Sequence, residues 1–137
     1  MKKQNFPVKL FVIIDEVHRL NKDKQDHLLP HIENGLLIIA GCTTANPYHS
    51  INPAIRSRCQ IVEVKPLSQD DIILGLNRAL TAENGLNNAY QVEDGVLSYI
   101  AQLSSGDIRY AYNCLEISTI LSEDSLITLD TVRKIFI

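Results

Sequence analysis

The chain has 137 residues, of which 45% are hydrophobic and 21% are charged, and its formal net charge is −3. A chain of this length can bury a core and form one compact domain or two small subdomains. The balanced charge gives no sign of a surface devoted to nucleic acids, although a local patch can still bind DNA. No apolar stretch approaches the length needed to span a bilayer, so no membrane partner is expected.

Strand, helix and strand are predicted in that order over the first third of the chain. Residues 8–14 form an apolar, β-branched run that is typical of a strand buried on both faces of a parallel sheet. A polar helix is predicted from about residue 22 to residue 33, ending at Asn34-Gly35, with a bend near Pro30. Residues 36–42 form a second apolar run and a second buried strand. This spacing predicts a parallel crossover unit.

The next segment is predicted to be mostly loop. Residues 43–52 are polar, and residues 53–57 are expected to form a short helix with Asn52 as its cap and proline at its first position. Polar and apolar residues alternate over residues 60–64, which predicts a third, shorter strand. Pro66 then marks a boundary, so we divide the chain into residues 1–66 and 67–137.

Only helices are predicted after residue 66. A capping box, Ser68-Gln-Asp-Asp71, opens the first of them, and Thr128 caps the last. The apolar residues that define the four helices are Ile72, Ile73, Leu76, Ala79 and Leu80; Val96, Leu97, Ile100 and Leu103; Ile108, Ala111, Cys114, Leu115, Ile117 and Leu121; and Val132, Ile135 and Phe136. The predicted fold class is therefore α/β, with part of a parallel sheet followed by an all-α bundle.

Two adjacent carboxylates, Asp15 and Glu16, follow the first strand. Open parallel sheets bind ligands at the carboxyl edge of their strands. One carboxylate there can hold Mg²⁺, which prefers oxygen ligands, and the other can polarise a water molecule for attack on phosphate. The alternative is a pair of acids that simply ends a strand.

Polar residues in two later loops are also candidates for a phosphate site. Thr44 and Asn46 follow the second strand and can orient a water or touch a terminal phosphate, or belong to an ordinary turn. Arg58 can bridge phosphate oxygens and stabilise charge in phosphoryl transfer. The alternative is that Arg56 and Arg58 are ordinary surface arginines.

Arg109 lies in the first turn of the third bundle helix, near a helix N-terminus that attracts anions. A solvated helix start is the alternative. The i, i+4 pair His27 and His31 has no Glu beside His27 as in the H-E-x-x-H zinc motif, and Pro30 lies between the two, so no zinc site is expected. His18 follows the acid pair and can contact the site or nucleic acid, or lie on the side of a helix.

The three cysteines, Cys42, Cys59 and Cys114, are widely spaced and include no C-x-x-C pair. Such spacing is typical of reduced, partly buried thiols in a cytosolic protein. The chain also contains no G-x-x-x-x-G-K-[ST] sequence, so it lacks the loop that cradles phosphates and supplies a hydroxyl to Mg²⁺.

The order of these motifs resembles the clamp-loader clade of the AAA+ ATPases. The resemblance rests on residues 11–19 (FVIIDEVHR), 41–47 (GCTTANP), 57–59 (SRC) and 106–109 (GDIR). The stretches QDHLLPH and NPAIRSRCQI are similar to one branch, the replication-associated recombination protein A family (RarA, also called MgsA), which has eukaryotic Werner-interacting relatives. The resemblance runs from about Val8 to the end of the chain.

The resemblance implies a role for each candidate residue. In such a nucleotide site, acids bind the metal and activate water, sensors contact the γ-phosphate, and a finger acts on ATP held by the adjacent subunit. The implied assignments are Asp15 as the Walker B acid that supports Mg²⁺, Glu16 as the catalytic glutamate, Thr44 as sensor 1 with Asn46 as its neighbour, Arg58 as the arginine finger, and Arg109 as sensor 2 in a helical lid.

The resemblance also implies a parent protein that hydrolyses ATP with Mg²⁺ and acts in DNA replication, recombination and repair at stalled forks. Expected partners are single-stranded or fork DNA, single-strand binding protein and further copies of itself, in the bacterial cytoplasm near the nucleoid. Family members carry the Walker A loop upstream and a helical domain downstream of the region matched here. The chain alone is therefore expected to be inactive.

Two other functions are consistent with parts of the sequence. One is a non-catalytic AAA+-like interaction module, comparable to the inactive subunits of clamp loaders. The other is a helical binding module formed by residues 67–137. The first is disfavoured because a scaffold has no chemical need for Asp15, Glu16, Arg58 and Arg109 together, and the second leaves the acid pair unexplained.

Overall fold

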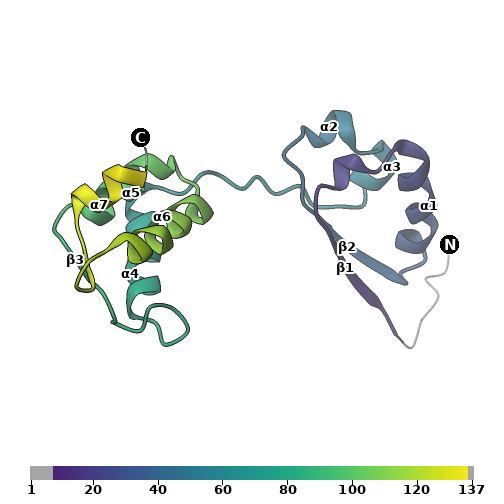
Figure 1. The fold of residues 1–137 in the computed structure, drawn as a ribbon. Helices are drawn as coiled ribbons and strands as arrows, with labels where there is room; N and C mark the ends of the chain where they lie inside the picture. The colour runs from purple at the N-terminus through teal and green to yellow at the C-terminus, as the bar shows by residue number, and fades with distance from the viewer. Residues whose placement is uncertain (1–7, 136–137) are drawn as a thin grey trace. The chain divides into compact units, whose positions relative to one another are not determined.

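A computed structural model describes residues 8–135 (Figure 1). The chain divides between Glu63 and Val64 into two compact units. Among the described residues, no helix combines the length and the apolar character that crossing a membrane requires. The predicted contribution of Phe136 to the last helix lies outside the described residues.

The first unit is built on a two-stranded parallel sheet and the helix that connects its strands. Its strands pair in register from Leu10 opposite Leu37 to Ile14 opposite Gly41, so both strands end at the same edge. The predicted crossover is thus confirmed, and the connecting helix has the predicted bounds. Its elements are β1 (Leu10–Ile14), the 3-10 helix η1 (Val17–Arg19), α1 (Lys22–Glu33), β2 (Leu37–Gly41), α2 (Pro47–Ser50) and α3 (Pro53–Arg56).

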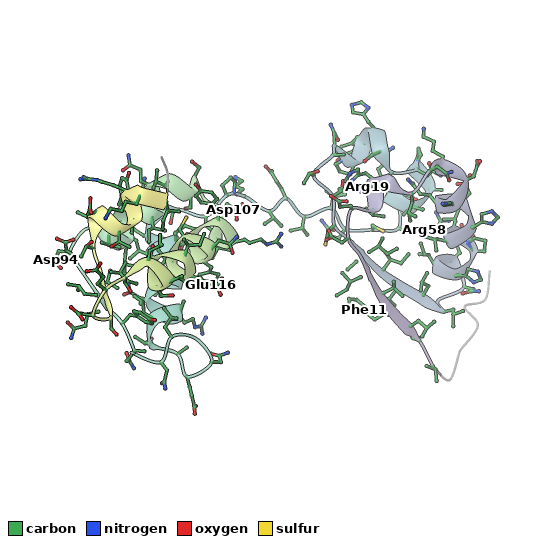
Figure 2. All side chains as sticks on the ribbon, viewed as in Figure 1. Phe11, Arg19, Arg58, Asp94, Asp107 and Glu116 are labelled. Atoms are coloured by element: carbon green, nitrogen blue, oxygen red, sulfur yellow. The ribbon has the colours of Figure 1, made fainter. Side chains whose placement is uncertain are left out.

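The prediction that the first strand is buried on both faces is wrong for the described residues. Phe11 and Ile13, in the middle of β1, have exposed fractions of 64% and 67% (Phe11 is labelled in Figure 2). The helix α1 packs against β2, and β2 is the neighbour of β1 in this sheet. An apolar strand without a second neighbour or a covering layer keeps its side chains in solvent.

Two further predictions for the first unit need correction. Residues 60–64 form no strand, because alternation describes only the side chains, whereas a strand also needs a neighbour for its backbone hydrogen bonds. The loop predicted over residues 43–52 contains α2, whose start was signalled by Asn46-Pro47. Asn46 caps α2 by accepting a hydrogen bond from the Tyr48 N–H, with proline at the first helical position.

A buried glutamine ties α2 and α3 to α1. Gln25 is 1% exposed; its amide nitrogen donates to the carbonyls of Leu20 (3.0 Å) and Ser50 (2.9 Å), and its amide oxygen accepts the Asn52 N–H at 2.8 Å. Asn52 occupies the predicted N-cap position of α3, but its side chain donates to Asp26 at 2.6 Å instead of capping the helix. Because buried polar groups are costly without partners, this network fixes the segment that leads to Arg58.

The second unit is a helical bundle. The four predicted helices and the Ser68–Asp71 capping box are confirmed, and hydrogen bonds from Ser68 lower the pKa of the Asp71 carboxyl. A pair of two-residue parallel strands was not predicted. The elements are α4 (Gln69–Thr81), β3 (Gln91–Val92), α5 (Val96–Ser104), α6 (Ile108–Leu121), β4 (Leu126–Ile127) and α7 (Leu129–Ile135).

The core of this unit joins residues from all four helices and β4. Its buried members are Ile72, Leu76, Leu80, Val96, Ile100, Ala101, Ala111, Cys114, Leu115, Ile127 and Val132. Ile117 and Leu121, which belong to the predicted apolar stripe of α6, remain exposed. All three cysteines are free, as expected, but only Cys114 is buried, and this burial raises the pKa of its thiol.

Gly106 allows the segment before α4 to pack closely against the start of α6. Its φ is +88°, and an added Cβ would lie 2.7 Å from the Cβ of Pro66 and 2.9 Å from the carbonyl oxygen of Leu67. We therefore expect Gly106→Ala to lower the free energy of unfolding by more than the roughly 1–2 kcal/mol that a left-handed alanine costs.

Gly95→Ala is the matched control, because Gly95 has a similar φ of +86° but its added Cβ would meet nothing closer than Leu129, at 3.9 Å. Urea unfolding of both variants measures the difference. Equal losses of stability would contradict the close approach at Gly106.

Candidate active site

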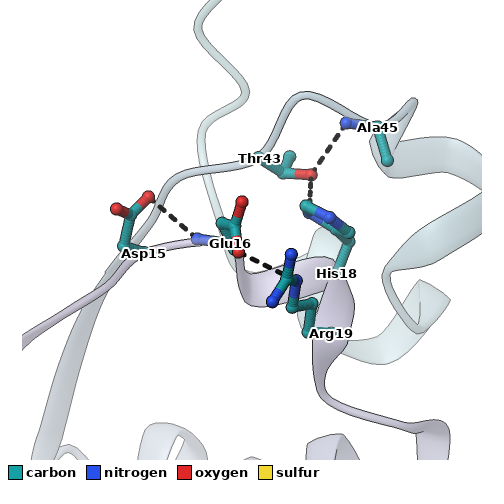
Figure 3. Close-up of polar contacts among 6 residues, drawn as sticks. All are labelled: Asp15, Glu16, His18, Arg19, Thr43 and Ala45. Carbon is teal, nitrogen blue, oxygen red and sulfur yellow. Dashed lines mark hydrogen bonds and ion pairs between the residues drawn. The ribbon is translucent and has the colours of Figure 1, made fainter.

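The ends of β1 and β2 bring the acid pair and the Thr44 loop to one edge of the sheet (Figure 3). Beyond the paired strands, the Cys42 N–H donates to the carbonyl of Ile14 and the Val17 N–H donates to the carbonyl of Cys42, both at 2.9 Å. These bonds continue the connection between the two chain segments past the last strand pair. The residues that follow each strand are therefore held near one another.

Asp15 and Glu16 occupy a tight turn. Glu16 has a left-handed backbone, with φ 48° and ψ 46°, which is uncommon for a residue other than glycine. The Asp15 Oδ1 accepts the Glu16 N–H at 2.9 Å and so stabilises the turn. Strained backbone of this kind is frequent at functional sites. The two adjacent carboxylates are both exposed at the sheet edge.

The Glu16 side chain forms an ion pair with Arg19, with 2.8 Å between Oε2 and Nε (Figure 3). The side chains are 49% and 75% exposed, respectively. Exposed pairs of this type contribute about 0–1 kcal/mol, so the pair does not prevent Glu16 from turning toward a ligand.

Thr44 lies in the loop after β2, and its neighbours are hydrogen-bonded. The Thr43 hydroxyl is 2.7 Å from the Nδ1 of His18 and accepts the Ala45 N–H at 3.0 Å. Thr44 itself is exposed. Asn46 uses its side-chain oxygen to cap α2, which gives it a local structural role in addition to any contact with a ligand.

Arg58 is held by its own chain at the end of α3. One guanidinium nitrogen, Nη2, pairs with the Glu33 carboxylate at 2.6 Å, and Nη1 donates to the carbonyl of Ala54 at 2.7 Å and to the Ser57 hydroxyl at 3.2 Å. Its side chain is 39% exposed. These partners belong to α1 and the α3 segment and do not include Asp15 or Glu16.

Arg56 is bound differently from Arg58. Its Nη1 donates to the carbonyl of Tyr48, and its guanidinium lies over the Tyr48 ring, 5.1 Å from the centroid. Its Nε is buried and has no hydrogen-bond partner among the described residues. Arg56 therefore packs α3 onto α2, while Arg58 has the more exposed guanidinium.

Arg109 belongs to the second unit. As predicted, it lies in the first turn of α6, where Asp107 caps the helix by accepting the N–H groups of Arg109 (2.9 Å) and Tyr110 (3.2 Å). Its side chain is exposed, as are Asn113 and Glu116 farther along the helix.

The acid pair fits Mg²⁺ better than a metal that needs a closed protein cage. Within residues 8–135, no group of three or more His, Cys, Asp or Glu side chains is arranged to hold a metal ion. Mg²⁺ usually keeps several waters and takes only one or two carboxylates, with phosphate oxygens completing its shell. The two exposed carboxylates at the sheet edge, those of Asp15 and Glu16, meet that requirement.

The chain matches known proteins over most of its length. It is 46% identical over 132 residues to replication-associated recombination protein A of Bacillus subtilis, covering 91% of this chain and 31% of that protein. It is 37% identical over 127 residues to the protein of that name in Escherichia coli K12, covering 89% and 28%. Over most of its length the chain is therefore similar to proteins of the replication-associated recombination protein A family. No family model matches it.

Two further comparisons support the AAA+ fold. The ATPase WRNIP1 of Dictyostelium discoideum is 36% identical over 115 residues, covering 82% of this chain and 13% of that protein. The Thermotoga maritima RuvB Holliday junction branch migration motor has a TM-score of 0.74 at 26% identity, covering 90% of this chain and 42% of that structure. The predicted α/β class with a helical bundle is thereby confirmed. The chain spans about a third of the length of the Bacillus relative.

Several residues around the site were not predicted from sequence. Gln25, Glu33 and Thr43 hold the loops that carry the candidate side chains, through hydrogen bonds and an ion pair to residues 25–27 positions away in the chain. Gln25 begins the QDHLLPH stretch and Thr43 lies in the GCTTANP motif, but no pattern in the sequence indicates which distant residues these side chains contact.

Proposed function

We propose that this chain supplies the hydrolytic and sensing residues of an AAA+ ATPase site. The protein that contains this site is proposed to act on DNA in replication and recombination. The observation that carries the proposal is the shared end of β1 and β2, in register at Ile14 and Gly41, which places Asp15, Glu16 and Thr44 at one edge. Bound Mg²⁺ would neutralise phosphate charge, with Asp15 supporting it through water.

The other roles in ATP hydrolysis are assigned to side chains of this chain. Glu16 accepts the proton of the attacking water, for which its exposed carboxylate at the turn is suited. Thr44 orients that water or touches the terminal phosphate. Arg58 acts on ATP bound by an adjacent subunit, and Arg109 is the sensor 2 residue that contacts ATP. A non-catalytic scaffold is not favoured, because the relatives include a protein named as an ATPase.

The biological setting is proposed from the relatives. The RuvB neighbour is described as a Holliday junction branch migration motor, and the curated relatives are named for replication-associated recombination. We infer that the parent of this chain forms homo-oligomers and works in the bacterial cytoplasm, near the nucleoid. Its proposed partners are single-stranded or fork DNA and single-strand binding protein.

The chain by itself should bind ATP weakly and hydrolyse none, because its 137 residues contain no phosphate-binding loop. Titration calorimetry with Mg²⁺-ATP measures the affinity of the purified chain. Tight, Mg²⁺-dependent binding would contradict the proposal that these residues lack the part of the site that holds the phosphates.

A chimera tests the proposed function. In it, this chain replaces the matching segment of the Bacillus subtilis relative, which supplies the remainder of the protein. We expect the chimera to hydrolyse ATP, and the same chimera carrying Asp15→Asn to need more Mg²⁺ or to lose turnover. A chimera that binds ATP and assembles like the Bacillus protein, but does not hydrolyse ATP under conditions where that protein does, would overturn the proposal.

A further inference from the structure

One side-chain hydrogen bond joins the loop after β1 to the loop after β2. His18 Nδ1 and Thr43 Oγ1 lie 2.7 Å apart, and both residues are half-buried (Figure 3). Among the hydrogen bonds of the described residues, no other side-chain pair links residues 15–20 with residues 42–46. A backbone bond from the Val17 N–H to the Cys42 carbonyl also joins the two loops.

The Thr43 hydroxyl also fixes the backbone on the far side of Thr44. It accepts the Ala45 N–H at 3.0 Å, so the residues before and after Thr44 are held by one oxygen atom. With that lone pair occupied, the hydroxyl can still donate its hydrogen to Nδ1 or accept a hydrogen from it. In either case a single bond from His18 sets the orientation of this hydroxyl.

The geometry points to His18 as a positioning residue for ATP hydrolysis, which acts through Thr43 to fix Thr44 relative to Glu16. This inference rests on the proposed function and adds a residue to it. His18 follows Glu16 by two positions, and Thr43 precedes Thr44 directly. A rigid link between the two loops keeps the water-activating acid and the sensor at a constant separation, and displacement of a reacting group by about 1 Å can cost on the order of 100-fold in rate.

The bond is suited to positioning because the fold does not depend on it. His18 and Thr43 are outside the buried core residues, and the strand pairing and the Gln25 network hold the first unit independently. Its loss should therefore loosen the Thr44 loop without unfolding the unit.

A double-mutant cycle in the chimera separates positioning from a general structural effect. We expect His18→Ala and Thr43→Val each to lower kcat by about 10–100-fold while the KM for ATP changes little. Because both remove the same bond, the double variant should be no slower than the slower single variant. Thr43→Ser keeps the hydroxyl and should restore most of the turnover.

Amide hydrogen exchange in the isolated chain tests the contact without requiring turnover. His18→Ala should speed the exchange of the Ala45 N–H and leave the α1 amides as protected as before. If the unsubstituted chimera hydrolyses no ATP, the proposed function fails, while Ala45 exchange still reports whether His18 orders the loop. Full turnover in His18→Ala, additive effects of the two substitutions, or unchanged Ala45 exchange would each overturn the role of His18.

Discussion

Replacing Arg58 with alanine in the chimera should lower ATP turnover by about 10³–10⁵-fold while ATP binding changes little. Arg58 presents a half-exposed guanidinium that its own chain holds against Glu33, away from the acid pair. A cation held in this way can reach a nucleotide on a neighbouring subunit and stabilise charge that develops as the phosphate is transferred. ATP binding precedes that charge, so it should survive the substitution.

Stability does not explain the expected loss. The Arg58–Glu33 pair is partly exposed to solvent, and pairs of this kind contribute at most about 1 kcal/mol. Arg56→Ala is the matched control, because Arg56 lies only two residues before Arg58 but packs over the Tyr48 ring. The Arg56→Ala substitution should lower the melting temperature but leave ATP turnover nearly unchanged at a temperature where the variant is folded. Equal turnover losses in the two variants, measured at a temperature where both are folded, would show that Arg58 is not the finger.

Replacing Glu16 with glutamine in the chimera should lower kcat by about 10²–10⁴-fold with ATP affinity preserved. Glutamine has the shape of glutamate but cannot accept the proton of the attacking water. The left-handed turn and the hydrogen bond from the residue 16 N–H to the Asp15 carboxylate do not involve the side chain of residue 16, so the backbone geometry should persist. Steady-state kinetics and nucleotide titration separate the two quantities.

Arg19→Ala distinguishes the chemistry of Glu16 from its ion pair. That substitution removes the 2.8 Å contact with Glu16 and leaves the carboxylate in place. We expect kcat to stay within a few-fold of the unsubstituted chimera, because an exposed pair of this kind is weak. A loss as large as that of Glu16→Gln would mean that the ion pair matters, and that proton transfer to Glu16 does not.

Local signals predicted much of the fold. Contiguous apolar runs and their spacing predicted β1, α1 and β2, and the capping box at Ser68 predicted the start of α4, because each depends on neighbours in sequence. Alternation over residues 60–64 predicted a strand that is not there, since its side-chain pattern cannot supply a pairing partner. The exposed face of β1 likewise depends on what covers it and cannot be predicted from the run itself.

The candidate site was predicted less completely than the fold. The acid pair and Thr44 are at one sheet edge, as parallel strand topology requires, and Arg109 lies in the first turn of its helix. The contacts that orient these loops join residues far apart in sequence, such as His18 with Thr43 and Glu33 with Arg58. Periodicity and capping carry no information about such pairs.

Complementation between two inactive chimeras tests most directly whether Glu16 and Arg58 serve one hydrolysis site from adjoining subunits. The Arg58→Ala chimera retains Glu16, and the Glu16→Gln chimera retains Arg58. When the two are mixed and allowed to exchange subunits, some interfaces combine an intact Glu16 with an intact Arg58. We predict that the mixture recovers ATP turnover well above that of either variant alone. Mixed oligomers that form but remain as inactive as the separate variants would contradict the shared site.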